Sequence, residues 1–268
     1  MIAAILAESY PGFEAPDPAH EFAPEPIWSF SLFGLEFDIT RLTLVSWFAS
    51  IVLLIFLLAA ARKPKIVPGK LQFLGESLYG FIRQGIARDV IGPNGIKYAP
   101  FLATFFVFIL IQNVMGIFPL SMIPATGAYS LPLVLALIVY VFYIGVGIKH
   151  QGLATYAKNL AIVPGVPPAM HIILVPLELL QKLVVRPFTL SVRLFANMFA
   201  GHLLLAVFIL GGVYMASQPH LLLKILSPTS FVMALAMTFF ELLVELLQAY
   251  VFTLLAATYI EESASGGH

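Results

Sequence analysis

The stretch from His171 to about Ser217 is apolar for nearly fifty residues, and this length restricts how the chain can fold. As one helix it would be ~70 Å long, whereas the hydrocarbon core of a bilayer is ~30 Å thick. The stretch is therefore either two spans or one steeply inclined helix. Because residues 186–197 lack the Gly-Pro or Asn-Gly pairs typical of a membrane hairpin, we predict one long helix, bent where Pro187 removes a backbone donor.

Composition extends this prediction to the whole chain. Apolar residues make up 60% of the 268 residues and charged residues only 10%, far from the composition of a soluble domain. We predict an all-α integral membrane protein with about five spans, the last two long and tilted, plus one amphipathic helix on the membrane surface. The expected spans are 42–61, 99–120, 131–148, 171–217 and 229–261, and the expected surface helix is 70–91.

The two ends of the chain and its charges predict the topology. Residues 1–38 hold seven of the fourteen acidic residues and no Lys or Arg, and without a basic leader we expect them to be an extended extracytoplasmic tail of the mature chain. Nine of the fourteen basic residues fall on the segments that five spans would place inside. The positive-inside rule then puts the N-terminus outside and the C-terminus in the cytoplasm. Residues 1–268 are expected to form a single membrane domain, and the last helix is expected to start at the Ser227-Pro228-Thr229 cap.

Several function classes are disfavoured. A formal net charge of zero argues against a nucleic-acid surface, which needs a basic stripe. The chain has no cysteine for thiolate chemistry, no His-Glu-x-x-His metal motif and no Gly-rich phosphate loop, so we expect no bound metal or cofactor. Facing histidine pairs for haem are missing as well. A secondary transporter stays open, although repeated halves and paired broken helices are not evident.

Arg193 lies near the middle of the long apolar stretch, where a cation costs roughly 2.5 to 3.5 kcal/mol on insertion scales and so indicates a function. On an ideal helix Lys182, Arg186, Arg193 and Asn197 fall within about 60° of one another and form one polar stripe. His202 is nine residues after Arg193, hence on nearly the opposite side and ~13 Å further along the axis.

A second polar stripe lies in the last helix. Glu241, Glu245 and Gln248 recur at spacings of four and three, and Tyr259 returns to their line. Two carboxylates one turn apart in an apolar run resist being charged together, so at least one is suited to exchanging protons near neutral pH. A membrane-embedded row of Glu, Gln, Asn and His is the usual material of a proton relay.

Structural interpretations of the same residues also have to be considered. Arg193 could be a structural cation paired to Glu241 or Glu245, and His202 could simply pair with Glu241. The neighbouring amides Gln112 and Asn113 of the second span fit interhelical hydrogen bonds better than a pathway.

Glu178 and Lys182 are four residues apart and fit an ordinary helical ion pair, although Glu178 could also line an aqueous entrance. Small residues at Ala196, Ala200 and Gly201 would let another helix approach this part of the chain closely.

The segments RPFTLSVRLFANMFAGHLLL and LVELLQAYVFTLLAATYIEE together resemble subunit a of the rotary proton-translocating ATP synthase, the membrane stator beside the ring of c subunits. The resemblance covers about residues 176–262 and is supported more loosely by FILIQNVMGIFPL. It implies a non-catalytic subunit of a bacterial plasma membrane, or less readily of an organelle inner membrane. The implied partners are the c-subunit ring, the b subunits of the peripheral stalk and the remaining synthase subunits.

The resemblance also implies roles for the polar residues. Arg193 corresponds to the family's indispensable arginine, which faces the carboxylates of the c ring, and Asn197 and Gln248 match polar residues near it. His202 and Glu241 match positions where family members place an acid and a histidine in either order. Asn113 matches an asparagine that lines a half-channel. The chain departs from some relatives because it has no aspartate between residues 113 and 124.

Overall fold

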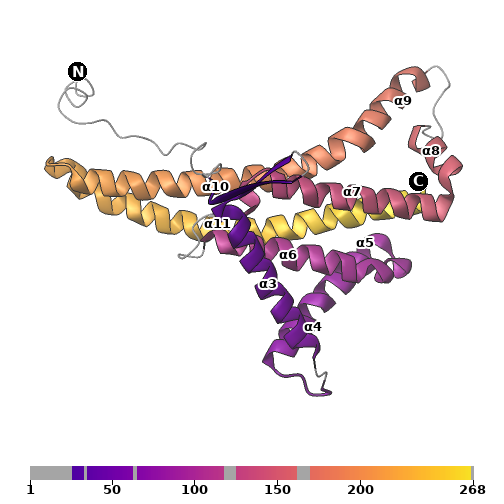
Figure 1. Ribbon diagram of the computed structural model, residues 1–268, viewed down its shortest axis with the longest axis horizontal. Helices are drawn as coiled ribbons and strands as arrows, with labels where there is room; N and C mark the ends of the chain where they lie inside the picture. Colours follow the sequence, from indigo (N-terminus) through magenta and orange to yellow (C-terminus); the bar gives the residue numbers. More distant parts are fainter. Residues whose placement is uncertain (1–25, 33–34, 63–64, 118–124, 162–169, 267–268) are drawn as a thin grey trace.

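Long helices make up most of the structure, a computed structural model that describes residues 26–32, 35–62, 65–117, 125–161 and 170–266. Among these residues, five helices are long and apolar enough to cross a membrane. The predicted class, an all-α integral membrane protein, is confirmed. Figure 1 shows that two of these helices, α10 and α11, form a pair that extends beyond the rest of the protein.

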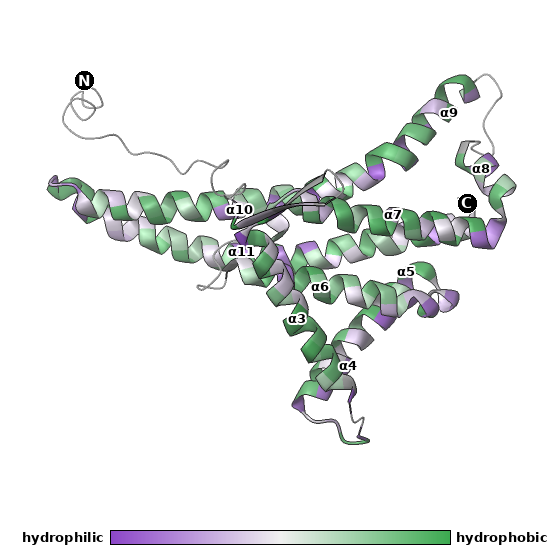
Figure 2. Ribbon diagram, in the orientation of Figure 1, coloured by the Kyte–Doolittle hydropathy of each residue, from purple (hydrophilic) through white to green (hydrophobic). Residues whose placement is uncertain are grey.

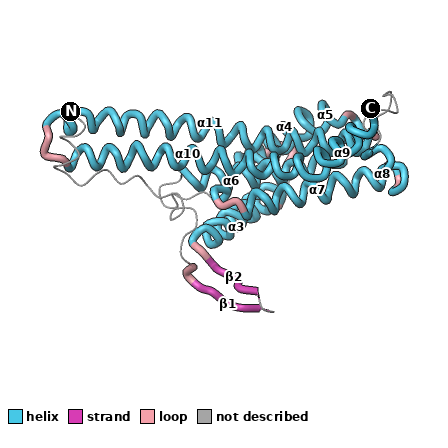
Figure 3. Tube along the Cα trace, turned by 90° about the horizontal axis from the view of Figure 1, so that it is seen from above, coloured by secondary structure: helices cyan, strands magenta, loops and turns pink. Residues whose placement is uncertain are grey.

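The described part of the N-terminal tail contains an unpredicted β-hairpin. Strand β1 (Trp28–Leu32) pairs antiparallel with β2 (Leu35–Ile39), with Trp28 opposite Ile39. The alternation of large apolar residues with Ser29 and Ser31 is the period of two that a strand requires, and we expected only an extended tail here. The hairpin leads into α3 (Arg41–Ala61), whose N-terminus is capped by Thr40 in a capping box. Figure 3 shows the hairpin projecting from this N-terminal end of α3.

The amphipathic segment at 70–91 is helical throughout but changes its winding. It consists of α4 (Lys70–Ile82), the π-helical turn η1 (Arg83–Arg88) and α5 (Asp89–Ile91). Ile82 and Ile86 are fully buried, because α4 and η1 pack against α6. Its apolar face therefore contacts protein as well as the expected membrane surface.

Two further spans form the middle of the molecule. A short 3-10 helix, η2 (Pro93–Tyr98), leads into α6 (Ala99–Ile117), and α7 (Ser130–Gln151) is followed by α8 (Leu153–Ala161). Both α6 and α7 pack against α11, so that their buried side chains share one apolar core with its C-terminal half.

The long stretch that starts at His171 is one continuous helix of 47 residues, as expected. It comprises α9 (His171–Leu180), the π-helical segment η5 (Gln181–Val185) and α10 (Arg186–Ser217). The segment η5 ends two residues before Pro187, and Figure 1 shows α9 turning away from the axis of α10 there. The bend thus combines the proline with a π-helical turn, which is a common cause of helix kinks.

The last helix starts earlier than predicted. Helix α11 runs over Leu221–Ser265 and its N-cap is His220, so Pro228 lies inside the helix rather than at its start. The hydroxyl of Ser227 does not cap the helix but donates to the carbonyl oxygen of Gly212 on α10 at 2.8 Å. Contacts with α10 stabilise the turn of α11 that contains Pro228. Prolines are tolerated in membrane helices when neighbouring groups bond to the backbone groups that the proline leaves without a partner.

Helices α10 and α11 lie side by side and antiparallel in both the front and top views (Figures 1 and 3). At 45 residues, α11 is ~68 Å long and, like the helix that contains α10, exceeds a ~30 Å hydrocarbon core. Both helices must therefore be strongly inclined within a bilayer. Figure 2 shows that the projecting part of the pair is predominantly hydrophobic, as a lipid-exposed surface requires.

Candidate functional site

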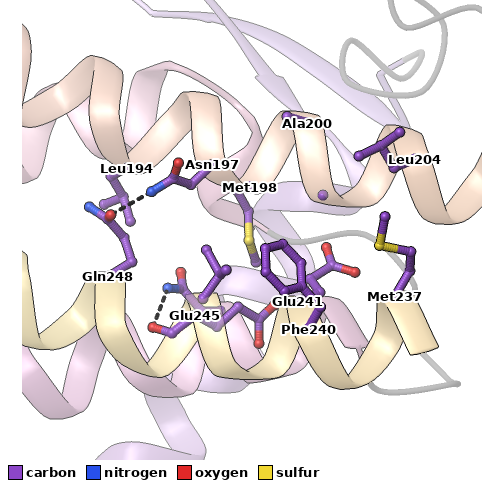
Figure 4. Close-up of a pocket in the computed structure, with 13 residues that line it drawn as sticks. Leu194, Asn197, Met198, Ala200, Leu204, Met237, Phe240, Glu241, Glu245 and Gln248 are labelled. Atoms are coloured by element: carbon purple, nitrogen blue, oxygen red, sulfur yellow. Dashed lines mark hydrogen bonds between the residues drawn. The ribbon is translucent and has the colours of Figure 1, made fainter. Parts of the chain in front are cut away.

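The central feature of the site is a cavity of about 200 Å³ between α10 and α11, with α6 contributing one residue. Apolar side chains form most of its wall. Its polar lining comes from five side chains, drawn in Figure 4: Asn113, Asn197, Glu241, Glu245 and Gln248. Five of the seven site residues predicted from the sequence thus line one cavity.

The two carboxylates of the cavity are buried. Glu241 is only 5% exposed and Glu245 only 2%. Within the described residues, one oxygen of Glu241 and both oxygens of Glu245 have no hydrogen-bond partner. Buried carboxylates without protein partners are unusual and point to exchange with water, ions or protons. A cavity of this size has room for several water molecules, at ~30 Å³ each.

Amide side chains join the helices around the carboxylates. Asn197 of α10 donates to the side-chain oxygen of Gln248 on α11 at 2.7 Å. Asn113 of α6 donates to the backbone oxygen of Glu245 at 3.5 Å and accepts from the hydroxyl of Thr126 at 2.9 Å. Asn113 therefore links helices and lines the cavity at the same time.

Gly201 brings α10 unusually close to the carboxylate of Glu241. A Cβ atom at position 201 would stand 2.9 Å from Oε1 of Glu241, closer than ordinary contact. The close approach expected from the small residues of this region is confirmed at Gly201. The sequence did not identify Glu241 as its neighbour.

Arg193 lies on the exposed side of α10 and makes no hydrogen bond or ion pair to any described residue. Its interpretation as a structural cation paired to Glu241 or Glu245 is therefore wrong. Arg186, seven residues earlier on the same face, does form an ion pair, at 2.8 Å from Glu262 of α11. Arg186 and Asn197, on either side of Arg193 in the sequence, are thus both bonded to α11, by an ion pair and a hydrogen bond. Arg193 makes no such contact with a described residue.

The remaining predicted residues lie outside the cavity. His202 is half-buried on α10 and is not among the residues that line the cavity, and its pairing with Glu241 stays a prediction. Gln112 donates to the hydroxyl of Ser46 on α3 at 3.1 Å, as its interhelical interpretation requires. Glu178 and Lys182 form the expected ion pair at 3.1 Å.

The apolar lining of the cavity was not predicted as part of the site. Met237 lies four residues before Glu241 and Val244 three residues after it, and Met198 and Leu204 line the cavity from α10. The spacing of Met237 and Val244 from Glu241 was visible in the sequence. Which residues of α10 lie opposite them depends on the axial offset of the two helices. In the described parts of the chain, no group of three His, Asp or Glu side chains is placed to hold a metal ion.

Fold and cavity together define a multi-pass membrane protein with buried carboxylates between its two longest helices, three of whose oxygens find no hydrogen-bond partner in the described chain. The family model described as ATP synthase A chain matches residues 43–261. The ATP synthase subunit a of a Nocardioides species is 40% identical over 263 residues, which cover 96% of this chain and 95% of the relative. That of Frankia alni is 38% identical over 269 residues, covering 100% and 91%. That of Pseudarthrobacter chlorophenolicus is 47% identical over 208 residues, covering 77% and 78%.

The chain belongs to the ATP synthase subunit a family. This membership connects it with ATP synthesis and proton transport, as a non-catalytic component of the membrane sector that works with other synthase subunits.

Proposed function

We propose that this chain conducts protons through two offset half-channels to and from the carboxylates of a c-subunit ring, so that proton flow turns the ring. The observation that carries the proposal is Arg193, an exposed cation on an apolar helix surface with no partner in the described chain. A charge at such a position is costly unless a partner outside the chain compensates it. A carboxylate presented by a neighbouring subunit has the required charge.

The surface around Arg193 suits a closely approaching helix. Ala196 and Ala200 follow it after three and seven residues and are exposed, so small side chains flank the guanidinium. Because a nearby cation lowers the pKa of an acid, Arg193 would keep a passing carboxylate deprotonated. It would also repel protons and so block direct flow between the two half-channels.

The cavity supports the proton-exchange part of the proposal. Glu241 and Glu245 are buried and line a space that can hold water, and three of their four carboxylate oxygens have no hydrogen-bond partner among the described residues. A proton relay needs such groups. We assign Asn113 and His202 to the same relay, and Asn197 with Gln248 to holding α10 and α11 in register. His202 and Arg193 lie on opposite sides of one helix, as two separated half-channels require.

The proposal includes partners and location. The b subunits of the peripheral stalk would hold the chain still, in a bacterial plasma membrane, with the N-terminus outside and the C-terminus in the cytoplasm. The asymmetric distribution of Lys and Arg supports this orientation. At ~2.3 kcal/mol per charge per 100 mV, several protons must pass to drive the synthesis of one ATP.

The test replaces the cation in the assembled synthase. Arg193→Ala should abolish ATP-driven proton pumping by inverted membrane vesicles, and Arg193→Lys should fail as well if the planar guanidinium is needed. Lys224→Ala is the matched control, because Lys224 is an exposed cation near the far end of α11. Near-normal pumping by the Arg193→Ala variant, with the complex intact, would contradict the proposal.

A further inference from the structure

A groove of about 560 Å³ lies between the start of α6 and the end of α7, separate from the cavity of Glu241 and Glu245. Its rim carries three basic side chains, Lys97, Lys149 and His150, and no acidic residue lines it within the described chain. Its floor and wall are apolar or aromatic. A groove that is basic at one end and apolar along its length has the polarity of an anionic lipid's binding site.

The rim holds a positive charge in a fixed position. Nδ1 of His150 is 2.9 Å from the carbonyl oxygen of Val146 and must donate its proton there. Nε2 of His150 therefore accepts from the ammonium group of Lys97, which is 2.9 Å away. The same ammonium lies 4.8 Å from the ring centre of Tyr98. Neither partner of Lys97 is an acidic group, so neither neutralises its charge.

The floor of the groove is open and its wall is rigid. A Cβ atom at Gly145 would meet no other atom within 4 Å, so the surface of α7 is bare at that position. Val141, one turn earlier, is 68% exposed and continues the apolar floor. The wall is the ring of Phe142, which stacks on Phe101 of α6 at a centroid distance of 3.7 Å. This geometry leaves an apolar channel along α7 that an acyl chain could fill.

The groove lies where two spans leave the apolar layer. Lys97 comes just before α6 begins at Ala99, and Lys149 with His150 comes just before α7 ends at Gln151. Figure 2 shows hydrophilic residues at this end of α7 and hydrophobic ones along the helix before it. The basic rim is therefore at the depth of lipid headgroups, where amphipathic rings such as that of Tyr98 are also enriched.

We infer that this groove binds one anionic phospholipid, with its phosphate between Lys97 and Lys149 and an acyl chain along Val141 and Gly145. The membrane helix of a partner subunit is the competing occupant. It fits less well, because it would have to present acidic side chains at the same depth to match the uncompensated rim.

The test measures lipid bound to the whole synthase in vesicles of nine parts phosphatidylcholine and one part spin-labelled phosphatidylglycerol. Each lysine at such a rim is expected to change the affinity for an anionic lipid about fivefold. Lys97→Gln with Lys149→Gln should therefore remove one motionally restricted phosphatidylglycerol per complex, whereas Lys158→Gln, an exposed lysine on α8, should not. Equal lipid restriction in the double variant and the wild-type complex would overturn the inference.

Variants at Gly145 distinguish a bound lipid from other ligands of the groove. Gly145→Leu fills the floor without changing a charge, so it should weaken phosphatidylglycerol binding severalfold. Excess inorganic phosphate should not displace the lipid from the wild-type complex, and displacement would show a site for the free anion instead. The chain has no cysteine, so Gly145→Cys can carry a single benzophenone photo-cross-linker. A lipid adduct supports the inference, and an adduct to another subunit overturns it.

Discussion

The carboxylate of Glu241 occupies the space that a side chain at Gly201 would need, since a Cβ there would stand 2.9 Å from Oε1. Gly201→Ala should therefore push the carboxylate aside while α10 and α11 still pair. Because small displacements of reacting groups are costly, proton flux through the membrane sector should fall on the order of tenfold. Gly211→Ala is the matched control, because a Cβ there meets only Ser230 Oγ at 3.9 Å. Equal flux in both variants would show that the position of Glu241 is unimportant.

Glu241 and Glu245 line one cavity, and in the proposed relay either carboxylate holds a mobile proton. Glu241→Gln should slow passive proton flux about tenfold, because an amide cannot exchange the proton, and the double Gln variant should lose most of the remainder. Flux is measured in vesicles after removal of the catalytic sector. The exposed Glu76→Gln serves as the control. An unchanged rate in the single variant would assign Glu241 to helix packing alone.

The hydrogen bond between Asn197 and Gln248 should couple the two helices energetically. A double-mutant cycle with Asn197→Ala and Gln248→Ala should give a coupling of about 0.6 to 1.7 kcal/mol, the range of interhelical hydrogen bonds in membranes. The quantity measured is the free energy of unfolding of the purified chain in mixed micelles. Pairing Asn197→Ala with Ser227→Ala, far along α11, should give a coupling near zero, and a similar value in both cycles would argue against a specific bond.

The ion pair between Arg186 and Glu262 should stabilise the C-terminal end of α11. Glu262→Ala leaves a half-buried guanidinium without its carboxylate and should lower the free energy of unfolding by about 1.5 to 3 kcal/mol, the range for charged hydrogen bonds. The neighbouring Glu261→Ala should have a much smaller effect, since Glu261 forms no ion pair with a described residue. A loss of the same size in both variants would mean that Arg186 finds another partner.

Much of the helical framework could be predicted because the bilayer fixes its scale. The apolar run that became α3 is bounded by Arg41 and Arg62 and has the length of one span, so its limits could be found without tertiary information. The start of α11 could not be found in this way. Local rules favour a cap at Ser227 and Pro228, but the bond from Ser227 to Gly212 depends on where α10 lies.

The site was predictable to the extent that it lies on one helix. Spacing alone places Glu241, Glu245 and Gln248 on the same face. Spacing within α11 does not say which residue of α10 opposes them, because that depends on the axial offset of the two helices. For this reason the contact between Gly201 and Glu241, and the lack of an ion pair between Arg193 and any described residue, could be found only in three dimensions.

The π-helical segment Gln181–Val185 determines the direction in which Arg193 points. Its wider turns hold one residue more than an α-helical path would, so the helix before it and the helix after it have different angular phases. Regular α-helical winding through the same number of residues would turn everything beyond the segment by about 100° relative to α9. The wider winding of this segment, rather than any side chain in it, therefore sets the side of the helix on which the guanidinium emerges.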